Sequence, residues 1–152
     1  MKSSLLLALT LSLLTAIPVQ AQNPNYNMEL AQELGADELG MKFYVLAILK
    51  TGSNQNADPE TVQKSFAGHL ENINRLAEEN KLIVAGPLMP NEDNFRGIFI
   101  LNVATLEEAV ELLQSDPAIR ENLLAPDLYQ WYGSAALSKY LEAADQIWQQ
   151  KP

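Results

Sequence analysis

His69 is the only histidine in this chain of 152 residues, and Asp116 follows it later in the sequence as part of an Asp-Pro step. Histidine has an unperturbed pKa of about 6.5, so it is well suited to take and return protons near neutral pH. A carboxylate that accepts a hydrogen bond from the imidazole fixes the ring tautomer and favours the protonated ring. These residue types therefore allow a His–Asp pair for general acid–base chemistry.

Asp116 has a second role open to it, because an aspartate before a proline is a common start for a helix. The chain uses the same step at Asp58-Pro59. A helix cap occupies one carboxylate oxygen with backbone N–H groups, which leaves the other oxygen for a ring nitrogen of His69. The two roles are compatible, and sequence spacing alone does not choose between them.

His69 also has two interpretations. It follows Phe66 by three residues and precedes Ile73 by four, which places its ring on or beside the apolar face of a helix. It is either a core histidine bonded to a carbonyl group or a general acid–base group at the edge of a pocket. A ring nitrogen within about 3.2 Å of the carboxylate, at a pocket wall, favours a functional site. A histidine sealed in the core excludes the enzyme.

Other kinds of site have less support. The sequence has no cysteine and no second histidine, so we expect no metal site and no cofactor. No G-x-S-x-G motif marks a nucleophilic serine, and Gly86-Pro87 lacks the pattern of a phosphate-binding loop. Our candidate substrate-binding residues are Tyr44, Pro87 and Trp131, although aromatic residues of strands more often belong to the core.

The first 21 residues have the pattern of a cleaved export signal. Lys2 precedes an apolar stretch from Leu5 to Ile17, which is shorter than the roughly 20 residues that cross a bilayer. We therefore expect an exported, periplasmic protein that is cleaved after Ala21 and has no membrane anchor. The formal net charge of −9 makes nucleic acid and anionic membranes poor partners. The same acidity is unfavourable for attracting an anionic substrate.

The remaining sequence predicts one α+β domain, in which apolar runs predict strands and three- and four-residue apolar spacing predicts helices. Strands are expected at 42–50, 82–85, 95–102 and 125–132, the main helices at 59–79 and 105–113, and a short helical piece after Asp116. Terminal helices are expected at 28–34 and 137–148. This order is that of a ferredoxin-like split β-α-β fold, an antiparallel four-stranded sheet with both main helices on one face.

The second face of this sheet needs a cover. An antiparallel sheet with one wet face alternates apolar and polar residues, but Phe43–Leu49 and Ile98–Leu101 are apolar without a break. The cover is either the same face of a second copy, which gives a two-fold homodimer, or the terminal helices. The size of the apolar patch favours the homodimer.

The chain resembles the YciI-like (YCII-related) domain from about Met41 to Trp131. The resemblance rests on a helix-borne histidine, an Ala-Gly-Pro strand end and a late Asp-Pro, in the segments 69–82, 84–88, 97–100 and 115–118. The signal sequence and the segments 36–41 and 131–134 resemble a secreted branch of that family. The resemblance implies a dimeric α/β barrel formed through the sheets, with His69 and Asp116 as the catalytic pair.

Two positions depart from the family pattern. Asn80 stands where relatives often have glycine, and Thr51 stands where the secreted branch often has arginine, so a positive charge near that strand end is missing. The resemblance divides the chain into a signal peptide (1–21), an N-terminal extension (22–40), the YciI-like domain (41–133) and a C-terminal amphipathic helix (134–152).

Two functions of different classes remain open at this stage. In the first, the protein is a lyase, dehydrohalogenase or isomerase, and His69 moves a proton at a carbon beside a carbonyl or leaving group of a small organic molecule. Related dimeric barrels isomerise lactones and remove hydrogen chloride from ring lactones, so this class rests on analogy. In the second, the dimer binds a small ligand without catalysis. Haem binding, known for other dimeric barrels, is a third option.

Overall fold

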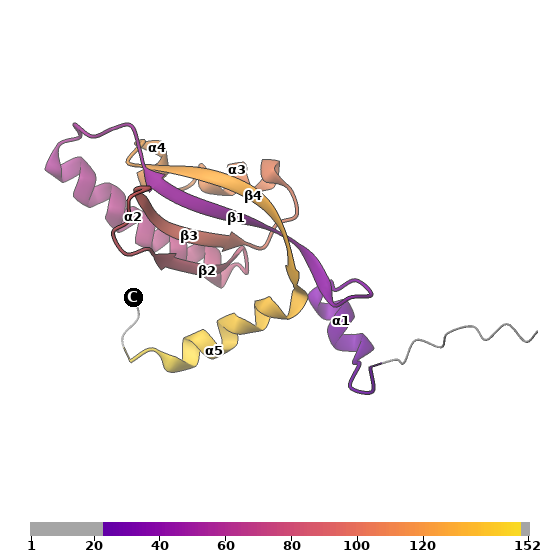
Figure 1. Cartoon of the computed structure of the whole chain (residues 1–152). Helices are drawn as coiled ribbons and strands as arrows, with labels where there is room; N and C mark the ends of the chain where they lie inside the picture. The colour runs from indigo at the N-terminus through magenta and orange to yellow at the C-terminus, as the bar shows by residue number, and fades with distance from the viewer. Residues whose placement is uncertain (1–22, 150–152) are drawn as a thin grey trace, which may run out of the picture.

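The computed structural model describes residues 23–149, which form a four-stranded sheet with helices packed against it (Figure 1). The expected export signal lies outside the described residues. The central elements are β1 (Met41–Thr51), α2 (Pro59–Glu78), β2 (Leu82–Pro87), β3 (Phe95–Leu101), α3 (Leu106–Leu113), α4 (Pro117–Arg120) and β4 (Leu124–Ser134). They are preceded by α1 (Met28–Leu34) and followed by the 3-10 helix η1 (Ala135–Lys139) and α5 (Tyr140–Ile147).

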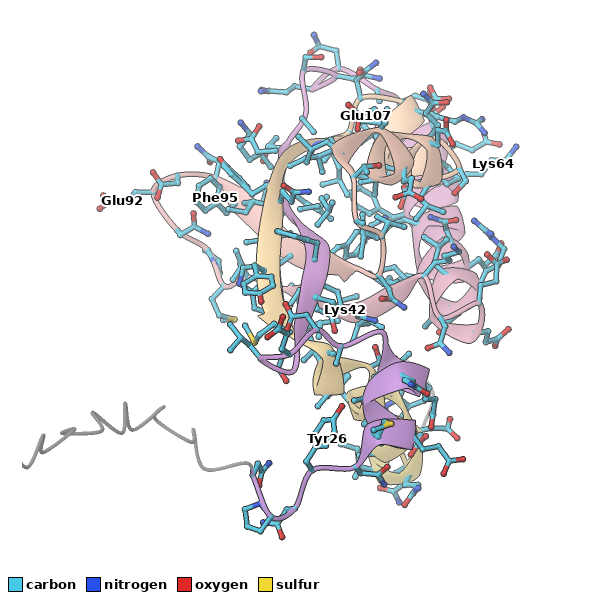
Figure 2. All side chains as sticks on the ribbon, turned by 90° about the vertical axis from the view of Figure 1, so that its right-hand side faces the viewer. Tyr26, Lys42, Lys64, Glu92, Phe95 and Glu107 are labelled. Carbon is cyan, nitrogen blue, oxygen red and sulfur yellow. The ribbon has the colours of Figure 1, made fainter. Side chains whose placement is uncertain are left out.

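The strands follow the order β2-β3-β1-β4, and every neighbouring pair is antiparallel. Each main helix connects two strands that are separated by one neighbour, as the ferredoxin-like fold requires. Figure 2 shows α2, which carries Lys64, and α3, which carries Glu107, on one side of the strands. The predicted α+β fold with its four-stranded antiparallel sheet is therefore confirmed.

The face of the sheet that meets the helices holds the main core. Successive residues of a strand point to opposite faces, so Val45, Ala47 and Leu49 of β1 point to the helices together with Phe99 and Leu101 of β3. Buried leucines and alanines of α2, α3 and α4 complete this cluster. The core thus holds α2 and α4, the two helices that bear on the His–Asp pair, at defined positions against the sheet.

The opposite face, which we call the outer face, is also apolar. Leu46 lies opposite Ile100, and Ile48 lies opposite Ile98, and all four alternate with core residues along their strands. Each of them is half-buried in the single chain. The two central strands therefore have apolar residues on both faces, which explains the unbroken apolar runs in the sequence.

The terminal helices pack away from the centre of the outer face. A shallow hollow lies between α5 and the C-terminal half of α2, with Ala77 on one wall and Leu141 and Ala144 on the other. The 3-10 helix η1 covers only the beginning of β1, where the hydroxyl of Tyr44 donates to the backbone carbonyls of Ser134 and Ala135. The terminal helices are therefore not the cover that the sequence left as an alternative to a second copy.

Local signals begin and end α2 as predicted. The carboxylate of Asp58 accepts hydrogen bonds from both the N–H and the hydroxyl of Thr61, and proline occupies the first turn. The bond from the Thr61 hydroxyl is the main reason that the pKa of Asp58 lies below its usual value. After the helix, Asn80 has a φ of 56°, so asparagine takes the left-handed conformation that glycine often provides.

The N-terminal extension is tied to the sheet. Helix α1, which was expected at 28–34, ends at Gly35, where φ is 69° in the left-handed region that glycine readily adopts. Asp37 then accepts hydrogen bonds from two backbone N–H groups of the following turn and from the hydroxyl of Tyr132 on β4. Lys139 pairs with Glu33 of α1 at 3.1 Å. Helix α1 and η1 thus lie side by side at one end of the sheet, and α5 runs back from there, away from α1 (Figure 1).

Candidate active site

Helix α2 places His69 against the sheet. Helical spacing puts His69 and Asn72 on the buried side of the helix. The imidazole stacks on the ring of Phe99 from β3, with 5.8 Å between ring centroids, and meets the ring of Phe66 edge-on at 6.1 Å. The His69 side chain is only 11% exposed. Aromatic packing therefore holds the ring plane in place.

Asp116 performs both of the roles that were predicted for it. Its Oδ1 accepts the backbone N–H of Ala118 at 2.9 Å and that of Ile119 at 3.4 Å, which caps α4. Its Oδ2 lies 2.7 Å from Nδ1 of His69. The carboxylate is fully buried, and a buried carboxylate is tolerated only when its oxygens are paired. The cap and the imidazole together meet that requirement.

A close approach of α2 and α4 brings the pair together. A methyl group at Gly68 would lie 2.8 Å from Cγ of Pro117, a distance shorter than ordinary van der Waals contact. Glycine, which has no side chain, lets the helix backbone come this near to the proline ring. The Gly68-His69 and Asp116-Pro117 steps therefore meet in a single contact between the two helices.

A polar network behind the pair was missed by the sequence analysis. Asn72 donates from Nδ2 to Oδ2 of Asp116 at 3.4 Å, and its Oδ1 accepts from Nη2 of Arg75 at 2.7 Å and from Oγ of Ser115 at 2.9 Å. Arg75 also donates to Ser115 Oγ at 3.0 Å. The three-residue spacing of His69, Asn72 and Arg75 was a signal for a shared face. Only the packing of α2 against the segment before α4 shows that Ser115 lies beside Asn72 and Arg75.

The hydrogen bond to Asp116 determines which nitrogen of His69 is free. Because a carboxylate accepts, Nδ1 carries the proton, and Nε2 of the neutral ring carries a lone pair. Within residues 23–149, every buried side-chain nitrogen or oxygen has a hydrogen-bond partner. Nε2 of His69 has no such partner, so it is not one of the buried atoms. Nε2 is therefore open to the space beside the ring.

That space is a pocket of about 340 Å³, which we call the His69 pocket. Its walls include Phe66 and Ile73 of α2, Pro87 of β2, and Arg96 and Phe99 of β3. Apart from His69 and Arg96, the described lining residues are apolar or glycine. The volume is near the lower end of the usual range for ligand sites, roughly 300–1,000 Å³. Both criteria for a functional site are met, since the pair is close and lies at a pocket wall.

Comparison with known proteins assigns this arrangement to a family. The YCII-related domain matches residues 41–129, which is more than half of the chain and includes the whole sheet except the end of β4. The chain belongs to the YCII-related domain family. The matched range contains both residues of the His–Asp pair and all the walls of the His69 pocket.

Two similar proteins place this YCII-related domain among its relatives. The uncharacterized protein YjpA of Bacillus subtilis (strain 168) is 30% identical over 69 residues, which cover 45% of this chain and 78% of YjpA. A similar solved structure is 5-chloro-2-hydroxyhydroquinone dehydrochlorinase (TftG) from Burkholderia phenoliruptrix AC1100 in complex with 2,5-dihydroxybenzoquinone. It is 20% identical, has a TM-score of 0.41, and the match covers 57% of this chain and 92% of TftG.

The other predicted site residues of the YCII-related domain occupy two different places. Pro87 lines the His69 pocket. Tyr44 and Trp131 do not line it, because they lie opposite each other on β1 and β4 at the outer face, with ring centroids 5.5 Å apart. The Tyr44 ring is buried, which raises the pKa of its hydroxyl, and that hydroxyl donates to the carbonyl of Ser134. The structure thus separates these two aromatic residues from His69.

Arg96 is the pocket residue that the sequence analysis missed. Its Nε donates to Oγ1 of Thr51 at 2.8 Å, across the β3–β1 pairing. The resemblance had indicated a missing positive charge at Thr51, and a guanidinium from the neighbouring strand lies at that place instead. The signal in the sequence was a single charged residue between Phe95 and Gly97, at the start of an otherwise apolar strand. Strand pairing was needed to place it beside Thr51.

Two further observations apply to residues 23–149 alone. In this part of the chain, no group of three or more His, Cys, Asp or Glu side chains is placed to hold a metal ion. None of the helices described there is both long enough and apolar enough to cross a membrane.

Gly68→Ala tests whether the helix contact sets the geometry of the pair. Alanine normally stabilises a helix interior by about 1 kcal/mol relative to glycine. Here the added methyl group overlaps Pro117, and such overpacking costs about 1–3 kcal/mol. We therefore expect no gain in the free energy of unfolding and a weaker Nδ1–H···Asp116 bond. Chemical denaturation and the Nδ1 proton signal of the single histidine in NMR spectra measure these two effects.

The neighbouring exposed residue Ala67 provides the control. Ala67→Gly changes helix propensity without touching Pro117 and should lower the free energy of unfolding by about 1 kcal/mol. A full stabilisation of that size in Gly68→Ala, with an unchanged Nδ1 proton signal, would show that the contact does not constrain the pair.

Proposed function

We propose that this YCII-related domain protein is an acid–base enzyme of the lyase, dehydrohalogenase or isomerase type that acts on a small organic molecule. The proposal rests on the hydrogen bonding and the position of the His69 ring. Its Nδ1 is bonded to a fully buried carboxylate, and its Nε2 is open to a pocket with mostly apolar walls. An imidazole with one nitrogen fixed and the other free is suited to proton transfer with a bound molecule.

The proposed reaction begins at a C–H bond beside a carbonyl group of the substrate. Nε2 takes the proton, and the electron pair of the C–H bond either moves toward the carbonyl group, which gives an enolate, or forms a new C=C bond. In an elimination, a leaving group departs with its own bonding pair, whereas in an isomerisation His69 returns the proton at another carbon. Asp116 faces the positive charge that forms on the ring, and its position is held by the N–H groups that cap α4.

Two substitutions test this proposal directly. His69→Ala removes the base, and Asp116→Asn retains an oxygen for the α4 cap but removes the charge that faces the imidazolium. Each should lower the rate of proton transfer by about 100- to 10,000-fold. The measurement is exchange of solvent deuterium into carbon acids, followed by proton NMR. The compounds are γ-lactones, β-keto acids and chlorinated dihydroxybenzenes.

Asp58→Asn is the matched control, since it makes the same change at the other Asp-Pro helix start and should leave the exchange rate unchanged. Exchange that persists at the full rate in His69→Ala contradicts the assigned role of the histidine. Binding of these compounds by the wild-type protein without any exchange would favour a ligand-binding module instead.

We further propose that two copies pack through their outer faces to form a homodimer. The support is the apolar character of that face, where Leu46, Ile48, Ile98 and Ile100 are half-buried and Tyr129 is 51% exposed. Contiguous apolar patches on soluble proteins commonly mark interfaces. The terminal helices pack elsewhere, and a two-fold axis lets one patch cover another.

Ile100→Glu tests the homodimer. A charge placed in a dry interface costs about 3 kcal/mol, which weakens association about 100-fold. We expect the molar mass from light scattering to fall from two chains to one. Val110→Glu is the control, because Val110 is 45% exposed on α3, on the helix side of the sheet, and its replacement should leave a dimer. A wild-type protein that has the mass of one chain at every concentration contradicts the proposal.

We also propose that the protein is an exported member of its family. The support is the pattern of residues 1–21, with a lysine, an apolar stretch and a small-residue cleavage site. The N-terminal residue of the protein isolated from its own cells checks this proposal. Gln22 is expected there, and retention of Met1 contradicts cleavage.

A further inference from the structure

Arg96 lies where two hollows of the surface meet. The His69 pocket adjoins a second hollow of about 390 Å³, which we call the polar recess. Three residues line both hollows: Phe66, Arg96 and Leu124. The polar recess is otherwise lined by Thr51, Asn54, Gln55 and Leu123. One end of the His69 pocket therefore has the guanidinium of Arg96 and opens toward the polar recess.

Arg96 has no acidic partner in the described chain. None of the ion pairs formed among residues 23–149 includes Arg96, and neither hollow has Asp or Glu among its described lining residues. Asp116, the carboxylate of the candidate site, is fully buried and bonded to Nδ1 of His69. The whole chain has 19 acidic and only 10 basic residues. The two hollows are thus a local exception to an acidic protein, and they favour an anion.

The orientation of the guanidinium is restrained by one hydrogen bond. Nε donates to Oγ1 of Thr51 at 2.8 Å, and the Nη1 and Nη2 groups make no hydrogen bond to the described residues. Their N–H groups form a planar fork that matches the two oxygens of a carboxylate. A carboxylate can therefore bind end-on to Arg96 while Thr51 keeps its own bond.

We propose that Arg96 binds a carboxylate of the substrate, so that the molecule on which His69 acts is a small organic acid with an apolar body. The apolar body lies between Phe66 and Phe99, its carboxylate reaches Arg96, and its acidic C–H faces Nε2 of His69. By holding the carboxylate, the guanidinium orients the molecule so that the C–H bond beside its carbonyl group stays within reach of Nε2. The substrate class rests on the proposed function, whereas the anion site does not depend on catalysis.

Benzoate and its neutral amide, benzamide, test the anion site in titrations followed by calorimetry. The wild-type protein should bind benzoate saturably and prefer it to benzamide by at least about 10-fold, the value of a charge-assisted hydrogen bond. Arg96→Gln should weaken benzoate binding by about 10- to 100-fold and leave benzamide binding unchanged. Because Arg96 is exposed and forms no ion pair with the described residues, this variant is expected to fold normally, and its melting temperature checks that.

Three further variants sharpen the result. Arg96→Lys keeps the charge but loses the fork, so its affinity should lie between those of the wild type and Arg96→Gln. Thr51→Val removes only the restraint on Nε and should give a smaller loss. Lys64→Gln removes one positive charge from the exposed side of α2, well away from Phe95 in Figure 2, and should leave benzoate binding unchanged.

His69→Ala separates this proposal from the proposed function. In this variant benzoate should still be preferred to benzamide, because Arg96 is intact, whereas deuterium exchange should fall by about 100- to 10,000-fold. Equal benzoate affinity in the wild type and Arg96→Gln overturns the anion site, as does the absence of saturable benzoate binding by the wild type. Loss of benzoate binding in Arg96→Gln, together with no exchange in any organic acid, supports the anion site and contradicts the acid–base enzyme.

Discussion

The structure depends on the burial of one charge. An ionised carboxylate taken out of water costs several kcal/mol unless its oxygens are paired, and Asp116 is fully buried. Its partners come from three places: the first turn of α4, the ring of His69 and the amide of Asn72. The imidazole and the amide, both on α2, reach it because α2 and α4 come into contact at Gly68. The helix crossing, the cap and the candidate catalytic pair are therefore one solution to a single electrostatic requirement.

That solution also prepares His69 for chemistry. With Nδ1 held by Asp116 and the ring held by two phenylalanines, Nε2 has a defined direction before any molecule binds. An apolar wall around it reduces competition from water, so charges in the pocket interact more strongly than they would at the surface. Arg96 supplies positive charge to a pocket that has no Asp or Glu among its described lining residues. A net charge of −9 is thus a poor guide to this pocket.

Strand β1 contributes residues both to the His69 pocket and to the outer face. Its odd-numbered residues Val45, Ala47 and Leu49 face the helices, and Leu49 lines the His69 pocket. Even-numbered residues such as Ile48 face outward. The strand lies at the centre of the sheet, between β3 and β4, so one set packs in the core while Leu46 and Ile48 of the other set lie on the outer face. The register that seats the core therefore also determines which residues lie on the outer face. A second copy on that face would pack directly behind the walls of the candidate site.

The sequence by itself determined the elements, their order and two of the key residues. Helix caps, glycine or asparagine stops and apolar periods act over a few residues, so Asp58, Asn80 and the unbroken strand runs could be interpreted locally. The two-oxygen role of Asp116 also followed from the geometry of a cap. Only the tertiary structure decided that His69 meets Asp116, that Arg96 lies beside Thr51, and that Tyr44 and Trp131 lie away from the pocket. Those outcomes depend on strand register, on the face to which each residue points and on the approach of two helices, and none of these is encoded by neighbours along the chain.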